Sequence, residues 1–330
     1  MEGIKIIKRP KLKNPYMLVA WPGMGEVAFK AASYLVEKLK AEEFAEISSA
    51  DFFYFTGVAV QEGILNLPEL PHSKFYFWKK PIDKNNPKSQ RRDLIIFLSN
   101  AQPDLIKAEE YSKKIIQVAK SFGVKTVIGC AAMPAPIEHT QEARVWFTTT
   151  SAELNSVYKK YDLNLLTQGQ VSGMNGLLLG MAKKEGLEGI CLLGEIPLYT
   201  LQVDNPKAAH AVLKVLSKIL DVKIDYTGII DQIHIMDEEI NKLLEFLKTG
   251  TQQVDAPIGE EEIERIRHSL GQLTKLPVSV KEKIEKLFEQ AKTDILKASE
   301  LKLELDKWSV YKDYEDKFLD LFRKPKDKSN

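Results

Sequence analysis

QVSGMNGLLLGMAKKEGLEGICLLGEIP, residues 170–197, carries the strongest indication of the fold class in this sequence. Its first half predicts a glycine-rich turn and then a helix over Leu177–Ala182, which is apolar on nearly every face and is therefore expected to be buried. Gly186 is expected to end that helix, and Ile190–Leu193 is a continuous apolar run typical of a parallel-sheet strand. The chain then leaves the sheet at Gly194 and Glu195, and α/β proteins bind ligands beside such strand exits.

The same order of strand, small-residue turn and helix occurs upstream. The apolar run Tyr16–Trp21 is followed by a helical pattern over Glu26–Lys40. The apolar run Asp93–Leu98 is followed by a helical pattern over Asp104–Phe122, and Lys125–Cys130 is the next strand. We therefore predict an α/β fold, a sandwich of helices around a largely parallel sheet, whose strand-end loops lie along one sheet edge.

A β-rich section separates these units. Phe52–Val60 and Ile64–Leu67 are predicted strands joined by the turn Gln61–Gly63, and Phe75–Trp78 is a further short strand. Lys79–Arg92 is expected to be a polar surface loop.

The last hundred residues differ in character, because their apolar residues recur at helical spacing. Helices are predicted over Asp231–Lys248, from Glu260 to Leu270, from near Val278 to about Lys307, and over Tyr311–Phe322. We predict two domains: an α/β domain over residues 1–225 and an all-helical extension over residues 226–330.

Composition excludes several classes of function. The formal charge is +1 over 330 residues, so nothing favours nucleic acid, which requires a basic face. No apolar run reaches the length of about 20 residues that a membrane span needs. Cys130 and Cys191 lie in apolar runs without C-x-x-C spacing and are expected to be buried free thiols, with a redox pair as the less favoured alternative. Together with an amino terminus unlike a signal peptide, they predict a cytoplasmic protein.

The loops after the strands supply the candidate binding residues. Glu26, Asn100, Gln102, Asn175 and Glu195 all lie near glycines or prolines. If these loops share one edge, the five side chains converge on one crevice, and the two carboxylates could act as an acid and a base or hold a metal. The alternative, which we favour, is that the five side chains cap helices and tie loops together.

Other motifs carry less chemistry. Gly23-Met24-Gly25 lacks the third glycine of a dinucleotide fingerprint, and neither a P-loop nor a G-x-S-x-G elbow occurs. The histidines lack the spacing of metal ligands, and His139 is the one expected near the crevice. We therefore predict no metal site and no cofactor, and we assign no catalytic residue.

Four motifs, in this order along the chain, resemble the second proteasome assembly chaperone family, whose prokaryotic members were once labelled enzymes of the ATP-grasp superfamily. The resemblance covers about Met17–Leu220, and its motifs are Trp21–Ala28 (WPGMGEVA), Ser99–Pro103 (SNAQP), Ser172–Gly180 (SGMNGLLLG) and Cys191–Pro197 (CLLGEIP). It implies a three-layer α/β/α fold of the phosphorylase/hydrolase-like kind. It also implies a homo-oligomer, with a trimer as the first expectation.

The resemblance also bears on partners. The family's eukaryotic members chaperone assembly of proteasome α-rings and offer no known catalytic residues to transfer. Some archaeal members engage the proteasome through a C-terminal tail of a hydrophobic residue, a tyrosine and any residue. This sequence ends Asp327-Lys328-Ser329-Asn330, so docking by that route is not expected.

Two hypotheses of function follow. The first is an oligomeric assembly chaperone or scaffold without catalysis, with itself and another protein as partners. The second is a small-molecule-binding protein, or a hydrolase- or ligase-like enzyme, that uses the strand-end crevice. The first predicts that polar groups at the crevice pair with one another, and the second predicts that they point unpaired into an open pocket.

Overall fold

The computed structural model describes residues 3–55, 57–61, 63–81, 92–161, 163–250, 278–293, 297–307 and 311–322. The chain divides into two compact units, Met1–Ile233 and His234–Asn330, and each is described by itself. No helix in the described ranges is long and apolar enough to cross a membrane.

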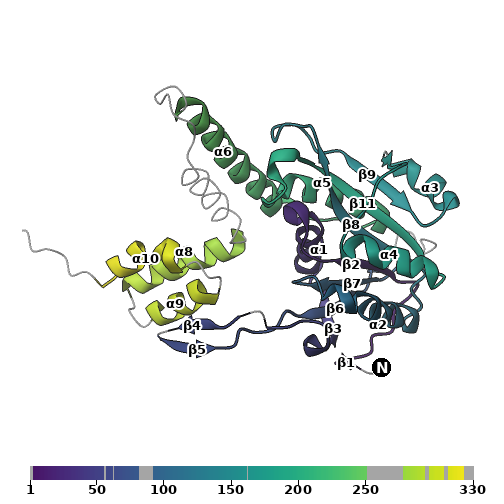
Figure 1. The fold of residues 1–330 in the computed structure, drawn as a ribbon, viewed down its shortest axis with the longest axis horizontal. Helices are drawn as coiled ribbons and strands as arrows, with labels where there is room; N and C mark the ends of the chain where they lie inside the picture. The colour runs from purple at the N-terminus through teal and green to yellow at the C-terminus, as the bar shows by residue number, and fades with distance from the viewer. Residues whose placement is uncertain are drawn as a thin grey trace, which may run out of the picture. The chain divides into compact units, whose positions relative to one another are not determined.

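A nine-stranded mixed sheet forms the centre of the first unit (Figure 1). Its spatial order is β1-β3-β6-β7-β2-β8-β11-β9-β10. The strands are β1 (Ile4–Ile6), β2 (Tyr16–Ala20), β3 (Glu42–Ile47), β6 (Ser73–Trp78), β7 (Leu94–Ser99), β8 (Thr126–Ala135), β9 (Val145–Thr149), β10 (Asn164–Leu165) and β11 (Glu188–Pro197).

The four central strands, β7, β2, β8 and β11, are parallel to one another. Their sequences are near-continuous apolar runs, and every residue of β7 is buried, as expected of strands that are covered on both faces. The flanking strands are mostly antiparallel: β1, β3 and β6 on one side, and β9 against β11 on the other. The predicted α/β fold is thus confirmed, with its parallel strands in the middle of the sheet.

Helices cover both faces of this sheet, which gives the three layers. The helices of the first unit are α1 (Val27–Lys38), α2 (Ala108–Ser121), α3 (Ala152–Tyr158), α4 (Met174–Lys184) and α5 (Pro206–Leu220). Buried residues of α1, α3 and α5 share one hydrophobic core with one face of the sheet. Buried residues of α2 and α4 share a second core with the other face.

Two strands run further than the sequence predicts. We expected β8 to end at Cys130 and the chain to leave the sheet at Gly194, but β8 continues to Ala135 and β11 to Pro197. These extensions pair with each other, from Ala131 opposite Leu193 to Ala135 opposite Pro197. The sequence did not predict these extensions, because small residues and Pro134 are not typical of strands. Their strand conformation depends on pairing with the neighbouring strand.

The predicted hairpin is present, but it is shorter and stands apart from the main sheet. β4 (Ala59–Gln61) and β5 (Ile64–Asn66) form a separate two-stranded sheet (Figure 1). Phe52 and Phe53, which we assigned to its first strand, are instead buried in the core beneath α2. Of the predicted polar loop Lys79–Arg92, residues 82–91 lie outside the described residues.

Helix α4 is longer and more one-sided than the sequence indicates. It begins at Met174 and buries Asn175, Leu178, Leu179 and Ala182, whereas Leu177 and Gly180 are exposed. The prediction that it is buried on every face was therefore wrong, because one side of the helix faces solvent.

In the second unit, α8, α9 and α10 share a small core of their own. The single helix predicted from near Val278 to Lys307 is instead two helices, α8 (Val278–Thr293) and α9 (Lys297–Lys307). They pack on each other and on α10 (Tyr311–Asp320), mainly through Ile284, Leu287, Phe288, Ala291, Ala298, Leu301, Leu305 and Phe318. α6 (Thr227–Gly250) begins in the first unit, where Ile229 is buried in the core with α1 and α5. The helix predicted at Glu260–Leu270 lies outside the described residues.

Two glycines of α4 provide a matched test of how tightly this helix is held. A Cβ on Gly176 would lie 2.1 Å from the Val171 carbonyl oxygen, whereas a Cβ on Gly180 would meet nothing within 4 Å. We expect Gly176→Ala to lower the free energy of unfolding by about 1–3 kcal/mol, because backbone must move. The control Gly180→Ala should raise it by up to about 1 kcal/mol through helix propensity. Urea denaturation measures both, and equal effects would contradict the tight contact.

Candidate functional site

The turn that follows β2 is held by the side chain of Asn175. Its Oδ1 accepts a hydrogen bond from the Trp21 backbone N–H at 3.1 Å, and its Nδ2 donates to the Trp21 carbonyl at 3.1 Å. Asn175 is buried in the first turn of α4, so its amide joins the start of this helix to the end of a central strand. These two bonds use one donor and one acceptor of the amide, as expected of a structural residue.

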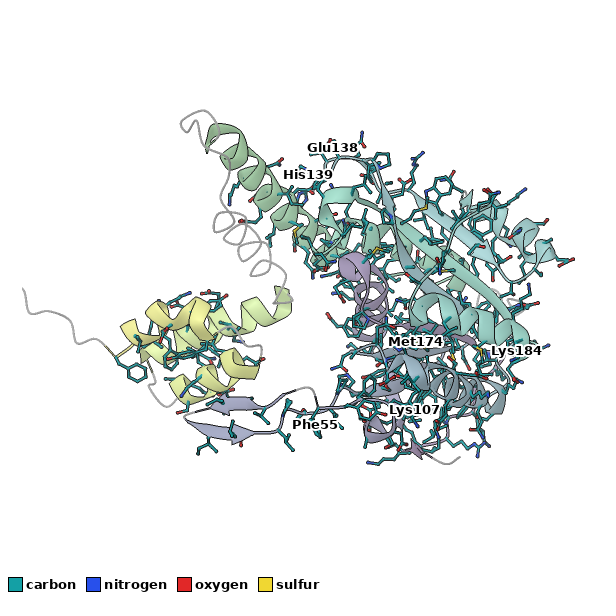
Figure 2. The ribbon with its side chains drawn as sticks, viewed as in Figure 1. Phe55, Lys107, Glu138, His139, Met174 and Lys184 are labelled. Atoms are coloured by element: carbon teal, nitrogen blue, oxygen red, sulfur yellow. The ribbon has the colours of Figure 1, made fainter. Side chains whose placement is uncertain are left out.

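Gln102 makes a second bridge to the same turn. Its Nε2 donates to the Pro22 carbonyl at 2.7 Å, and its Oε1 accepts from the Met174 backbone N–H at 3.0 Å. Figure 2 labels Met174, the first residue of α4. The amino terminus of a helix attracts anions through its free N–H groups, and here a side chain of the protein takes one of them.

Asn100 lies after β7 and ties that strand to β6. Its side-chain Oδ1 accepts a hydrogen bond from the His72 backbone N–H at 2.8 Å, and the backbone N–H of Asn100 donates to the His72 carbonyl at 3.2 Å. This is the pattern of a side chain that continues the ladder between two antiparallel strands where the ladder ends.

Glu195 is 1% exposed, and both of its carboxylate oxygens are engaged. Oε2 accepts from the Arg144 backbone N–H at 3.2 Å and from Arg144 Nε at 3.0 Å, and Oε1 accepts from Trp146 Nε1 at 2.7 Å. Burial by itself raises the pKa of the Glu195 carboxyl, but the donors on Arg144 and Trp146 outweigh burial, so its pKa lies below the usual value. Glu195 therefore joins β11 to β9 as an ionised carboxylate.

Glu26 has a different environment, at the end of the 3-10 turn Met24–Glu26 that directly precedes α1. Its backbone is left-handed, with φ 51°, and its half-buried carboxyl lies near Asp204 and Lys30. Burial, with a contribution from the charge of Asp204, raises the pKa of Glu26 to about 7. Lys30 Nζ lies 2.6 Å from Asp204 Oδ2, while the buried Oδ1 of Asp204 has no hydrogen-bond partner.

The two carboxylates lie on opposite sides of the sheet. Alternation along β11 places Glu195 on the same face as Cys191 and Leu193, which belong to the core beneath α2 and α4. Glu26 directly precedes α1, which covers the other face. The structure therefore brings Gln102 and Asn175 together at one turn, and it leaves Asn100, Glu195 and Glu26 in separate surroundings. That these residues bind a ligand stays a prediction.

Sequence reasoning missed several partners of these candidates. Asp204, Arg144 and Trp146 are distant in sequence from the carboxylates that they approach, and no motif marks them. Lys30 lies four residues after Glu26, at the spacing of one helical turn. His139 is buried beyond the end of β8, where its Nδ1 lies 2.9 Å from the Tyr199 hydroxyl (Figure 2).

A small cavity of about 220 Å³ lies at the end of the sheet where the central strands β2 and β8 begin. It is lined by Asn14, Pro15, Tyr16, Arg92, Gly123, Lys125 and Thr126. Tyr16 and Thr126 are the first residues of β2 and β8, so this cavity is remote from the strand-end candidates. Among the residues that the structure describes, no cluster of three or more His, Cys, Asp or Glu side chains could hold a metal ion.

Comparison with known proteins places most of the chain in one family. Residues 17–244 match the PAC2 family. Pyrococcus furiosus PbaB, described as an archaeal proteasome activator, is 30% identical, and the match covers 73% of this chain and 97% of PbaB with a TM-score of 0.62.

Two further relatives match over nearly their whole length. P. furiosus PbaA, described as an archaeal homolog of proteasome-assembly chaperone, is 23% identical over 76% of this chain and 96% of PbaA, with a TM-score of 0.56. At that identity the likeness shows the fold alone. An uncharacterised protein of Methanocaldococcus jannaschii is 28% identical over 271 residues, which are 80% of this chain and 98% of that protein.

The Glu195 contacts predict a loss of stability when its charge is removed. Glu195→Gln should lower the free energy of unfolding at pH 7 by about 1–3 kcal/mol, because it weakens the hydrogen bonds that a buried carboxylate accepts. A pKa depressed in the folded state means that this stabilisation exists above the unfolded pKa and is lost as pH falls through the folded pKa. The variant should therefore show a smaller loss of stability below about pH 4 than the wild type.

Glu185→Gln is the matched control, because Glu185 forms an exposed pair with Lys120. Such surface pairs contribute little, so urea unfolding at pH 7 should barely change. A structural role for Glu195 is refuted if both variants unfold like the wild type.

The raised pKa of Glu26 predicts the opposite dependence on pH. Between its usual value of 4.5 and about 7, the folded state holds a proton that the unfolded state has released, so stability falls as pH rises. Glu26→Gln should remove this decline and be more stable at pH 8, on the order of 1–2 kcal/mol after allowance for solvent screening. Glu37→Gln, on the exposed side of the same helix, should keep the wild-type slope. Unfolding free energies from pH 5 to 8.5 decide, and parallel curves for the wild type and Glu26→Gln would contradict the assignment.

Proposed function

The chain belongs to the PAC2 family, and we propose that it is an oligomeric, non-catalytic scaffold of the assembly-chaperone kind whose partner is the proteasome or its subunits. The observation that carries this proposal is the match to PbaB, a proteasome activator, over 97% of PbaB's length. A match over nearly the whole of PbaB supports a shared fold, and the proposal is that the two proteins also use corresponding surfaces for binding. The proposed α/β domain, residues 1–225, would supply the family surface, with residues 226–330 as an added helical extension.

The strand-end residues support the same proposal. Asn100, Gln102, Asn175 and Glu195 direct their polar groups to other groups of the protein. A binding site for a polar small molecule needs convergent polar groups that remain free for the ligand. The arrangement matches the expectation for a scaffold, and it gives no support to the alternative of a hydrolase- or ligase-like enzyme. Glu26 and Asp204 remain the pair to test if a small molecule is found.

We further propose that the protein acts in the cytoplasm as a homo-oligomer, with a trimer as the expected number of subunits. Self-association fits an assembly factor, because a symmetric oligomer presents the same surface several times to a symmetric ring.

The proposal is tested with purified full-length protein and the proteasome of its own source organism. Mixed at micromolar concentration, the chain should comigrate with the 20S particle or its α-subunits in size-exclusion chromatography, and native mass spectrometry should give the stoichiometry. Peptide hydrolysis by the particle, with and without the chain, separates activation from assembly. Albumin at equal concentration is the negative control. Absence of comigration with both particle and subunits would refute the proposed partner.

A further inference from the structure

An apolar arm leaves the core of the first unit after Phe53, and the chain contacts that core again at Leu70. Its described residues are 54–55, 57–61 and 63–67, and it includes the β4–β5 hairpin (Figure 1). Large apolar side chains along it are 48–67% exposed. They are Tyr54, Phe55, Val58, Val60, Ile64, Leu65 and Leu67. Val60 pairs with Leu65 across the hairpin, while Ile64 pairs with Gln61, so apolar groups occur on both faces.

The base of the arm is fixed to the core. Phe52 is buried against Tyr111 of α2, with ring centroids 4.9 Å apart, and its carbonyl accepts a hydrogen bond from the Asp104 N–H at 3.0 Å. Figure 2 shows Phe55 beyond this anchor, where the chain departs toward the hairpin. The exposure of the arm therefore belongs to a segment that is held at its base.

Next to that base is a second exposed pair, Leu105 and Ile106, which we call the ledge. They are 86% and 90% exposed, although Asp104 fixes their turn by accepting the Ile106 N–H at 2.7 Å. The hydrogen bond between Asp104 and Phe52 makes the ledge and the arm neighbours.

The arm and ledge together offer enough apolar surface for a stable interface. Complete burial of one such side chain removes about 60–120 Å² of apolar area, so the nine partly exposed side chains offer about 500 Å². A standard interface buries about 800 Å² per partner, of which about 450–500 Å² is apolar. One partner that covers this surface would thus find the apolar area of a whole standard interface.

The chemistry of the surface favours a permanent partner. Between Phe52 and Pro68 the sequence carries a single charged residue, Glu62, and low charge is typical of obligate interfaces. A two-stranded hairpin alone is marginally stable in water, and its open edges and apolar side chains promote aggregation when left uncovered. A second copy of the chain meets the need for constant cover, because it is always present at equal concentration.

We propose that the arm of one copy packs against the arm and ledge of a neighbouring copy, and that this contact, repeated around the symmetry axis, holds the oligomer together. The inference rests on the proposed scaffold role and identifies the surface that builds the scaffold.

The test is the mass of the full-length chain in solution. Val60→Lys combined with Leu65→Glu places opposite charges across the hairpin, which preserves the cross-strand pair and leaves the net charge unchanged. We expect the wild type to be a multiple of 37.4 kDa by light scattering, and the variant to dissociate to 37.4 kDa with at least a 100-fold weaker association. Val157→Lys, at an exposed apolar position on α3, should keep the wild-type mass and serves as the matched control.

Cross-linking checks the same contact without charge. Cys130 and Cys191 are both buried and should not react with a maleimide, so Leu65→Cys introduces the accessible thiol. A short bis-maleimide should link two chains in Leu65→Cys and not in Val157→Cys.

Two results would overturn the proposal: a monomeric wild type, or an oligomer that survives the charged pair. An oligomer of the second kind is tested further with Leu303→Glu, and it either dissociates on that change or survives it. The last two outcomes differ only in where the contact lies, and dissociation is the informative one, because it would assign the contact to the helical unit, where Leu303 is exposed on α9. Binding to the proteasome is measured separately on the same samples. Comigration of a monomeric wild type would overturn this inference and the proposed oligomer but leave the proposed partner supported. Arm-dependent assembly without comigration would overturn the proposed partner and leave this inference supported.

Discussion

The close approach of helix backbones to the paired strands β8 and β11 is the constraint on which the first unit depends. A Cβ on Gly129 of β8 would lie 2.9 Å from the Asn175 carbonyl, and a Cβ on Gly194 of β11 would lie 2.9 Å from the Ala208 carbonyl. Only residues without a side chain allow α4 and α5 to sit this near on opposite faces. The position of α4 then brings the Asn175 amide within reach of Trp21, so a packing constraint in the sheet determines how the neighbouring turn is held.

That turn connects the sheet to the start of α1. Trp21 is fully buried, and its ring centroid lies 5.2 Å from that of Phe97 of β7, while Asn175 and Gln102 bind the backbone of the turn. In sequence these polar residues resemble a binding site, but in the structure their hydrogen bonds connect the turn after β2, the start of α4 and the loop after β7. The same holds for Glu195, whose charge is matched by donors on β9. Structural polar residues and ligand-binding polar residues are of the same types. They are distinguished by whether each side chain bonds to the protein itself or points toward a ligand.

Glu26 is the exception among the candidates. It combines a left-handed backbone, a raised pKa and a carboxylate neighbour, and such features cost free energy in a folded protein. The raised pKa of Glu26 makes stability depend on pH between 4.5 and about 7, whereas the lowered pKa of Glu195 makes it depend on pH only in the acid range. The second unusual feature is the exposed apolar surface of the arm. Surfaces of this kind are typical of sites that bind proteins, not of catalytic sites.

The α/β class, the central strands and most helices of the first unit follow from the sequence, because continuous apolar runs and helical periods report burial directly. The five polar candidates could also be chosen from the sequence, because glycine and proline mark the strand ends near which they lie. Tertiary structure alone decided where β8 and β11 end, because pairing between the two strands carries them past Cys130 and Gly194. It also decided that Glu195 and Glu26 lie on opposite faces of the sheet and that α8 and α9 are separate helices. These outcomes depend on contacts between residues distant in sequence, which local patterns of polarity do not encode.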